Sequence, residues 1–221
     1  MKKTFIIPVT VLLALAFFAF GNNSITKKTD TRSQNKIKLV APEKTGGMPL
    51  MEALNKRHSS RNISSKKITD QELSNLLWAA FGISRDESGK RTAPTANDSR
   101  AMDVYVIMEN GTYKYIADDH SLDMVAEKDL RSFAGKQDFV YTAPVNLVYV
   151  ADYSKLKEGS DKEIYSGAHA GFIGENVYLY CSSAGLGSVV RAWVDKDALS
   201  REMNLNENQK IILAQTVGYT E

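Results

Sequence analysis

Apolar residues recur at helical spacing in several segments of the chain. In residues 69–82, Thr-Asp-Gln-Glu is a capping signal, apolar residues follow three and four positions apart, and a glycine closes the pattern. The longest such pattern spans 163–184 and is followed by Gly185, a typical C-terminal stop. We therefore predict helices over these two segments. Shorter helices are predicted at 49–55, 121–133 and 195–203.

Other segments carry the pattern of β-strands. Asn110 and Gly111 separate two apolar-rich runs, 104–107 and 113–116, and this dipeptide is the strongest short-range signal of a hairpin. Residues 145–150 form a near-continuous apolar run, which is typical of a buried strand. Because a hairpin precedes strands separated by helices, the pattern predicts one α+β domain with a mixed central sheet flanked by helices. The remaining strands are predicted at 189–194 and 211–217.

Three glycines interrupt the long predicted helix. Gly167, Gly171 and Gly174 are spaced four and three residues apart. Each costs roughly 1 kcal/mol relative to alanine inside a helix. Small residues on one helix face let another element or a ligand come close, so we expect tight packing along this face.

The first 47 residues differ in character from the rest of the chain. Lys2 and Lys3 precede a largely apolar run at 5–20 that ends before Gly21, the pattern of a secretory signal peptide. We predict a signal peptide at 1–21, a flexible polar linker at 22–47, one domain at 48–221, and export to the periplasm. The alternative is an uncleaved N-terminal anchor, although the run is shorter than the ~20 residues of a membrane span.

Composition and residue counts exclude several classes of site. The net charge is only +2 and the basic residues are scattered, so we expect no nucleic-acid partner. His58, His120 and His169 are the only histidines and lack the spacing of metal ligands, so we expect no metal. Cys181 is the single cysteine, which excludes an internal disulfide and predicts a small buried thiol. His169, among small and apolar residues, is predicted to be a packed or hydrogen-bonded histidine.

The pentad 57–61, Arg-His-Ser-Ser-Arg, is the strongest candidate for a binding site. It follows the short helical pattern at 49–55 and so lies at or just past a helix end. Two guanidiniums and a hydroxyl two residues apart can converge on one anion, and the planar fork of arginine matches a phosphate. The alternative is a solvated basic helix end, where cations are favoured by the helix dipole.

The pentad is the first of several motifs that occur in a recognisable order. The segment 91–96, Arg-Thr-Ala-Pro-Thr-Ala, precedes a predicted strand, and Glu-Asn-Val-Tyr-Leu at 175–179 leads to Gly-Leu-Gly-Ser at 185–188. Val-Gly-Tyr follows at 217–219. In this order the motifs resemble the nitroreductase family of FMN-dependent oxidoreductases, and more closely its thiazoline/oxazoline-dehydrogenase-like branch. The resemblance covers about residues 48–220.

The resemblance implies an obligate homodimer of nitroreductase-like fold, with FMN at each of two composite sites. Arg57 and Ser59 would hold the phosphate and ribityl chain, and Arg61 would lie near the N1–C2=O edge of the ring. His58 would either contact FMN or face away from it. Pro94, Thr95 and Ala96 would line the flavin through backbone groups, and Asn97 would meet its edge unless Asp98 has taken that place. Arg91 is expected to be a solvated loop arginine.

The segment after the glycines is implied to face the flavin ring as well. Val190, Arg191 and Ala192 would lie against one face of the ring, with a backbone N–H directed toward N5. Arg191 would either meet flavin or substrate or be a surface residue. A fixed backbone turn suits this role, because a donor at N5 requires geometry rather than a particular side chain.

The implied activity is an FMN-dependent oxidoreductase that transfers two electrons in a ping-pong scheme. NAD(P)H is a candidate donor, and a small nitro, quinone or similar compound is the acceptor. Few side chains then need to be catalytic, because the cofactor carries the chemistry. The alternative is a non-catalytic or vestigial flavin-binding module. The unusual segment 97–102 and the lack of basic residues after the last strand favour that alternative; the intact pentad and glycine segment oppose it.

Overall fold

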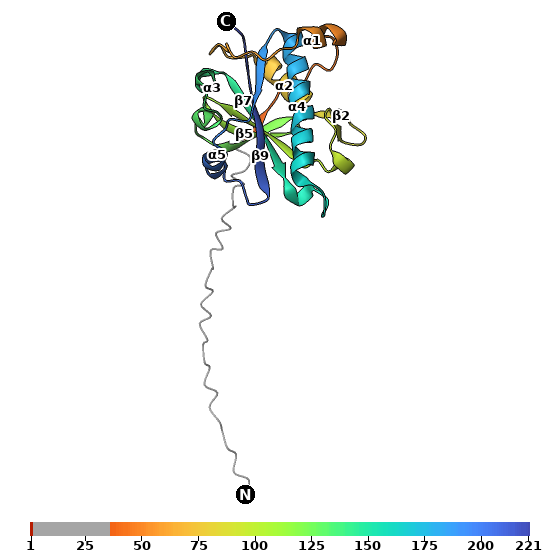
Figure 1. The fold of residues 1–221 in the computed structure, drawn as a ribbon. Coiled ribbons are helices and arrows are strands. Elements are labelled where there is room, and N and C mark those ends of the chain that lie inside the picture. The colour runs from red at the N-terminus through yellow and green to blue at the C-terminus, as the bar shows by residue number, and fades with distance from the viewer. Residues whose placement is uncertain (2–35) are drawn as a thin grey trace. The chain divides into compact units, whose positions relative to one another are not determined.

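Seven antiparallel strands form one sheet at the centre of the domain (Figure 1), in a computed structural model that describes residues 36–221 and Met1. The predicted signal peptide and the first part of the predicted linker lie outside the described residues. In sheet order the strands are β1 (Lys36–Lys38), β6 (Ser121–Ala126), β5 (Gly111–Ile116), β4 (Met102–Met108), β7 (Val145–Asp152), β9 (Gln209–Gly218) and β8 (Gly187–Arg191). A separate two-stranded ribbon joins β2 (Ile83–Arg85) and β3 (Lys90–Arg91).

Helices cover both faces of the sheet. One hydrophobic core joins the sheet to α2 (Asp70–Phe81) and α4 (Lys162–Ala184), and a second joins it to α3 (Asp138–Thr142) and α5 (Lys196–Glu202). Alternate residues of β7 serve the two cores: Leu147 and Tyr149 belong to the first, Val148 and Val150 to the second. The continuous apolar run of β7 therefore reflects burial on both faces, as predicted. The remaining helices are α1 (Leu50–Lys56) and the 3-10 turns η2 (Ala96–Asp98), η3 (Arg131–Phe133) and η4 (Tyr153–Lys155).

Most of the predicted elements are present. The capping signal before α2 forms a complete capping box, in which Thr69 accepts from the Glu72 N–H and Glu72 accepts from the Thr69 N–H. Strands β4 and β5 pair as the predicted hairpin around Asn110 and Gly111. Helix α4 ends at Gly185, whose φ of 72° is the left-handed conformation of a glycine C-cap.

The prediction of a mixed sheet needs correction, because every pairing among the described strands of this sheet is antiparallel. Helix α4 does return the chain so that β8 runs in the same direction as β7. However, β9 lies between them and is antiparallel to both. The pattern along the chain indicates that a helix connects β7 to β8. It does not indicate that the last strand, β9, inserts between them.

The predicted helix at 121–133 is wrong. Residues Ser121–Ala126 form strand β6, and only Arg131–Phe133 is helical, as a single 3-10 turn. Leu122 and Met124 alternate toward the first core, so a period of two governs this segment. His120, at φ 50°, occupies the turn that closes a second hairpin between β5 and β6.

The predicted linker also needs correction where it is described. Strand β1 pairs with β6 at the edge of the sheet, and the residues after it lie along α2. Ser74 donates to the Val40 carbonyl over 2.6 Å, and the Glu43 N–H donates to Asn75 Oδ1 over 2.7 Å. The folded domain therefore begins at or before Lys36 rather than at residue 48.

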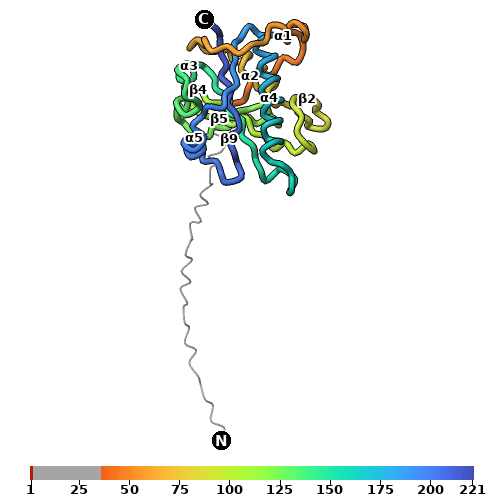
Figure 2. Tube along the Cα trace, viewed as in Figure 1, coloured from red at the N-terminus to blue at the C-terminus, as the bar shows by residue number. Residues whose placement is uncertain are grey.

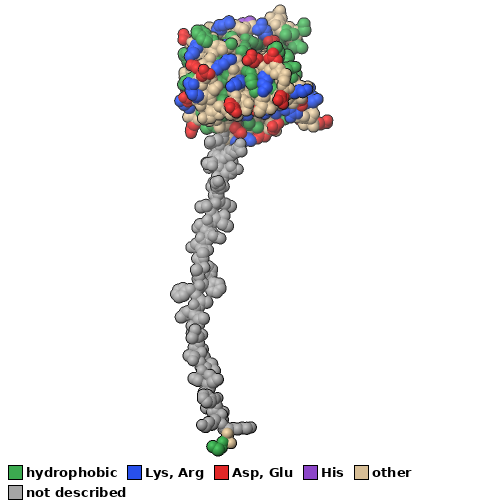
Figure 3. All heavy atoms as spheres, turned by 60° about the horizontal axis from the view of Figure 1, so that its bottom comes forward, with side chains coloured by type: hydrophobic (Ala, Val, Ile, Leu, Met, Phe, Trp, Pro, Cys, Tyr) green, Lys and Arg blue, Asp and Glu red, His purple; other side chains and the backbone are tan. Residues whose placement is uncertain are grey.

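The last residues of the chain run beside the segment that follows α1 (Figure 2). Ile63 and Thr220 form an antiparallel bridge, and the Ser64 N–H donates to the Tyr219 carbonyl over 2.8 Å. On the face seen in Figure 3, basic and acidic side chains are interspersed rather than gathered by sign. None of the helices in the described part of the chain has the length and apolarity of a membrane span.

Candidate functional site

The pentad begins where α1 ends. Arg57 is the C-cap of α1, and its N–H donates to the Ala53 carbonyl over 2.9 Å. Ala53 is buried against α4, where Ser182 donates to the same carbonyl over 3.0 Å. The ring of His58 donates from Nδ1 to the Lys56 carbonyl over 2.9 Å. His58 therefore satisfies an unpaired carbonyl at the helix end, which is a capping role.

Tyr178, on α4, joins the pentad to β8. Its hydroxyl oxygen accepts from the Val190 N–H over 2.8 Å, so its own proton is free to reach Ser59 Oγ at 2.9 Å. The Arg57 guanidinium carbon lies 5.2 Å from the centroid of the same ring, a cation–π contact. One side chain thus brings together three of the residues predicted from sequence. In the sequence, Tyr178 stands out only as part of the helix motif at 175–179.

The backbone holds the pentad against β8 as well. The Ser60 N–H donates to the Ser188 carbonyl over 2.9 Å. A Cβ on Gly187 would lie 2.9 Å from Ser60 Cβ and 2.5 Å from Thr220 Cγ2, so only glycine permits this approach. A hollow of ≈ 300 Å³ opens beside the pentad. Its lining includes His58, Ser60, Tyr178, Ser188 and Thr220.

The two arginines of the pentad have no carboxylate partner within the described residues. Arg57 is half-buried and Arg61 is exposed. These two arginines do not line the hollow, but guanidiniums that carry no protein counter-charge can receive a phosphate or another anion. The pentad therefore fits the phosphate-bearing cofactor that the motif implies.

The predicted flavin loop, residues 94–100, lies against a different part of α4. The Ala96 N–H donates to Nε2 of His169 over 2.8 Å, and the Arg100 N–H donates to Thr95 Oγ1 over 3.1 Å. Asn97, Asp98 and Arg100 all have positive φ, between 49° and 54°. Asp98 pairs with Arg100 rather than with Arg61, and hydrogen bonding from Arg100 lowers the pKa of Asp98. Pro94 is exposed.

The pentad and the loop do not meet within one chain among the described contacts. Tyr178 contacts the pentad and His169 contacts the loop, and these residues are 178 − 169 = 9 positions apart on α4. At 1.5 Å per residue this places the two attachments about 14 Å apart along the helix. The sequence motifs therefore form two separate half-sites on one helix.

The side chain of Arg191 is neither at the surface nor available to a flavin, which corrects both expectations for it. It is buried and donates to Thr216 Oγ1 at 3.0 Å, the Ala134 carbonyl at 2.7 Å and Asn146 Oδ1 at 3.1 Å. Burial lowers the pKa of Arg191 to about 10. Because neighbouring strand residues point to opposite faces, Val190 faces α4 and Arg191 faces the second core. Ala192, the next residue, is exposed.

Arg91 also differs from its expectation as a solvated arginine. Its guanidinium carbon lies 5.6 Å from the centroid of the Phe81 ring, and Nη2 bonds Asp118 at 3.3 Å. Only 12% of its side chain is exposed. Arg91 therefore ties the β2–β3 ribbon to α2 and to the β5–β6 turn.

Two predictions for α4 are confirmed. His169 is packed and hydrogen-bonded, with 2% of the residue exposed. Cys181 is buried, and burial raises the pKa of its thiol to about 12, so the nucleophilic thiolate is strongly disfavoured.

The glycines of α4 behave in two ways. A Cβ on Gly174 would lie 3.2 Å from Val190 Cγ2, which is the tight packing we predicted. Gly167 and Gly171 have no neighbour within 4 Å of such a Cβ. Around them the helix exposes apolar side chains: Ile164 is 67% exposed and Phe172 is 47% exposed. This exposed stretch, formed by Ile164, Gly167, Gly171 and Phe172, is called here the α4 apolar face; it begins before the attachment of the loop at His169 and ends before that of the pentad at Tyr178.

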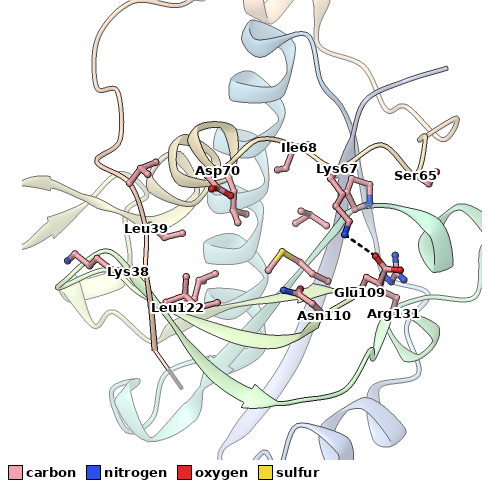
Figure 4. A pocket seen from close by; sticks show the side chains of 16 residues that line it. Lys38, Leu39, Ser65, Lys67, Ile68, Asp70, Glu109, Asn110, Leu122 and Arg131 are labelled. Carbon is pink, nitrogen blue, oxygen red and sulfur yellow. Dashed lines mark ion pairs between the residues drawn. The ribbon is translucent and has the colours of Figure 1, made fainter. Parts of the chain in front are cut away.

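A largely apolar hollow of ≈ 290 Å³ lies elsewhere, between β1, the start of α2 and the β4–β5 turn (Figure 4). Lys67 and Glu109 form an ion pair of 3.3 Å at this hollow. None of the site residues predicted from sequence lines it. The candidate site is therefore assigned to the half-sites on α4, where the unpaired cations and fixed backbone donors are, and not to this hollow.

The comparison with family models decides the assignment. The model described as the nitroreductase family matches residues 54–219, which include the pentad, the loop and β8. The chain belongs to the nitroreductase family. Members of this family are generally flavin-dependent oxidoreductases, in agreement with the motifs at 57–61 and 91–96.

Similar proteins give the same assignment. A nitroreductase-like protein of Methanocaldococcus jannaschii is 35% identical over 161 residues, which cover 67% of this chain and 81% of that protein. The crystal structure of a nitroreductase-like protein from Ralstonia eutropha is 43% identical with a TM-score of 0.81, covering 86% of this chain and 91% of that one. An NADPH:FMN oxidoreductase from Vibrio harveyi, solved with NAD⁺, is 17% identical with a TM-score of 0.57. The match covers 78% of this chain and 69% of that one, and it shows a shared fold alone.

Proposed function

We propose that this nitroreductase-family protein is an FMN-dependent oxidoreductase. It takes electrons from a reduced donor, with NAD(P)H as the candidate, and passes them to a small nitro, quinone or similar acceptor in a ping-pong order. The observation that carries the proposal is the junction at Tyr178, which holds Arg57 and Ser59 next to the Val190 N–H, with neither pentad arginine paired to a carboxylate of the described chain. The proposed closer kinship with the thiazoline/oxazoline-dehydrogenase-like branch rests on the motif at 91–96 alone.

The chain's own residues have distinct tasks in this proposal. Arg57 and Ser59 bind the phosphate, because a charge-assisted hydrogen bond to a dianion is the strongest polar contact they can offer. Arg61, which is exposed and has no carboxylate partner in the described chain, stabilises negative charge on the ring. FMN, when bound, supplies the two-electron chemistry. The backbone of the 94–100 loop orients the ring without taking part in proton transfer, while the Val190 N–H, bonded to Tyr178, fixes the junction.

We propose that two copies of the chain combine their half-sites. The attachments of the pentad and the loop are about 14 Å apart along α4, and the same helix carries the α4 apolar face with Ile164 and Phe172 exposed. A second copy packed on this face would cover the apolar side chains and bring its own half-site alongside. Open space at Gly167 and Gly171 permits a close approach of the partner.

Light scattering of a variant pair tests the composite site. Phe172→Asp introduces a charge into the α4 apolar face and should yield monomers that no longer retain FMN. Tyr141→Asp is the matched control, because Tyr141 is similarly exposed, at 41%, but lies on α3. A Phe172→Asp monomer that binds FMN as tightly as the unmodified protein would exclude a site built from two chains.

Export remains a proposal that rests on residues 1–21 alone. N-terminal sequencing of the protein from fractionated cells should find a mature chain that begins near Asn22, outside the cytoplasm. A full-length chain in the cytosolic fraction would contradict both the cleavage and the localisation. Export would also require an electron donor that is present in that compartment.

The absorbance spectrum and turnover of the purified protein test the proposed activity. We expect a flavin band that bleaches when NADPH or dithionite is added and recovers when a quinone or nitroaromatic compound follows. A stable flavin band that dithionite reduces, but that never returns electrons to an acceptor, would favour the vestigial flavin-binding module. The structural feature that supports this alternative is the presence of three non-glycine residues with positive φ in the loop.

A further inference from the structure

The contact between α4 and the 94–100 loop depends on one imidazole nitrogen. His169 Nε2 accepts the Ala96 N–H over 2.8 Å, so this nitrogen carries a lone pair and the ring is neutral with its proton on Nδ1. Nδ1 is buried without a partner in the described chain, and so is the hydroxyl of Ser166, one helical turn earlier. Among residues 36–221, no carboxylate forms an ion pair with His169, and burial is the one cause that shifts its pKa.

The loop needs such a contact because its own conformation is unfavourable. Asn97, Asp98 and Arg100 lie in the left-handed region, which residues with a Cβ avoid. Strained segments of this kind persist only where the surroundings hold them. Within the loop, the Arg100 N–H bonds Thr95, and the Arg100 side chain bonds Asp98 and Ser88. The bond to His169 is the one that joins the loop to a helix of the core.

We propose that His169 is a positioning residue, whose neutral imidazole fixes the Ala96 N–H and with it the flavin-facing loop, and whose protonation releases the loop. This inference rests on the proposed function in so far as the loop contacts FMN. It names a residue that the motifs do not include. It also makes the loop half-site sensitive to pH, whereas the Tyr178 junction of the pentad half-site is held by hydroxyl and backbone groups.

The surroundings of His169 set the direction of the pH effect. Tyr165 on α4 faces the imidazole, with ring centroids 6.2 Å apart, and Asp98 and Arg100 on the loop pair with each other. Burial lowers the pKa of His169 below its usual range, so the folded state favours the neutral ring. The stabilisation is complete above the unfolded pKa of about 6.5 and is lost as the pH falls below that value.

Two substitutions of His169 separate its role as a hydrogen-bond acceptor from its protonation. His169→Gln places an amide oxygen near the position of Nε2, so it can accept the Ala96 N–H but cannot be protonated. His169→Leu removes the acceptor. Between pH 7.5 and pH 5 the FMN affinity of the unmodified protein should fall about tenfold further than that of His169→Gln, in which the FMN phosphate still titrates with a pKa of about 6. The affinity of His169→Leu should lie about tenfold below that of His169→Gln at pH 7.5. His120→Asn, at the distant β5–β6 turn, should keep the acid loss.

Hydrogen exchange of the Ala96 amide, followed by NMR on the flavin-free protein, tests the contact without the cofactor. Protection should decrease with acid in the unmodified protein, persist in His169→Gln and be lost in His169→Leu. An acid loss of FMN affinity in His169→Gln as large as that in the unmodified protein, or unchanged protection of Ala96 in His169→Leu, would overturn the role of His169. If no variant binds FMN at any pH but the exchange follows the expected order, the proposed function fails while the contact stands.

Discussion

Helix α4 holds its two half-sites in different ways. Near its C-terminal end, Tyr178 bonds both Ser59 and the Val190 N–H, and the Ser60 N–H independently bonds β8. Nearer its N-terminal end, His169 holds the 94–100 loop through a single bond to the Ala96 N–H. The pentad has no residue with positive φ and is fixed by several contacts, whereas the loop contains three non-glycine residues with positive φ.

This difference assigns separate tasks to the two half-sites. A dianionic phosphate needs cations that stay in place, and the pentad supplies them through redundant contacts. A loop that adapts to a flavin ring can be strained and held by one bond, because small shifts in its backbone change the contacts with the ring. Loss of one contact should therefore have a limited effect on the shape of the pentad and a large effect on the shape of the loop.

The largest effect is expected from Arg57→Ala. A charge-assisted hydrogen bond contributes roughly 1.5–3 kcal/mol, so FMN affinity should fall by about ten- to 150-fold. Binding of riboflavin, which has no phosphate, should barely change. Titration of both flavins into the variant measures this directly. Lys128→Ala is the control, because Lys128 pairs with Glu202 and does not line the hollow beside the pentad.

Arg61→Ala should fail differently from Arg57→Ala. Both flavins should bind more weakly, and the reduction potential should shift downward, because the substitution removes a cation beside the reduced ring. Redox titration of the bound flavin gives the shift. If Arg57→Ala weakens riboflavin as much as FMN, Arg57 holds the fold or the ring rather than the phosphate, and the division of labour within the pentad is wrong.

Tyr178→Phe tests the junction itself. The ring stays under Arg57, but the Val190 N–H loses its acceptor, at a cost of about 1–3 kcal/mol in the free energy of unfolding. Urea denaturation measures this loss. Tyr180→Phe is the matched control on the same helix, where the hydroxyl donates to the Glu72 carbonyl over 3.2 Å instead of linking the half-site. Equal flavin affinities in the two variants would show that the junction does not shape the phosphate site.

The smallest effect is expected in the loop, from Asn97→Gly. Asn97 has a φ of 54°, and glycine adopts this region without the steric penalty, so stability should rise by less than about 1 kcal/mol. Thermal unfolding of the flavin-free protein tests this. Asp98→Gly would also lose the ion pair with Arg100, so it is a poorer probe. A loss of stability in Asn97→Gly would mean that the Asn97 side chain, and not the bond at His169, holds the loop.

The sequence by itself determined the local elements of this protein. The capping box before α2, the Asn110–Gly111 hairpin and the glycine stop of α4 each depend on interactions within a few residues, and each is present as predicted. The order of the motifs along the chain also identified the family, because that order can be read from the sequence without any knowledge of which residues are in contact. Strand β6 was missed because its short alternation overlaps a pattern that also suits a helix.

Only the tertiary structure decided which residues meet. Strand β9 inserts between β7 and β8, which makes the sheet antiparallel and turns Arg191 into the second core. Tyr178 meets Ser59 across 119 positions, and His169 meets Ala96 across 73. Such contacts depend on how α4 packs between distant segments, and nothing in the local pattern of either partner encodes the other. The physical reason is that local preferences act over a few residues, whereas a binding site is assembled by long-range burial and by the need to satisfy each buried polar group.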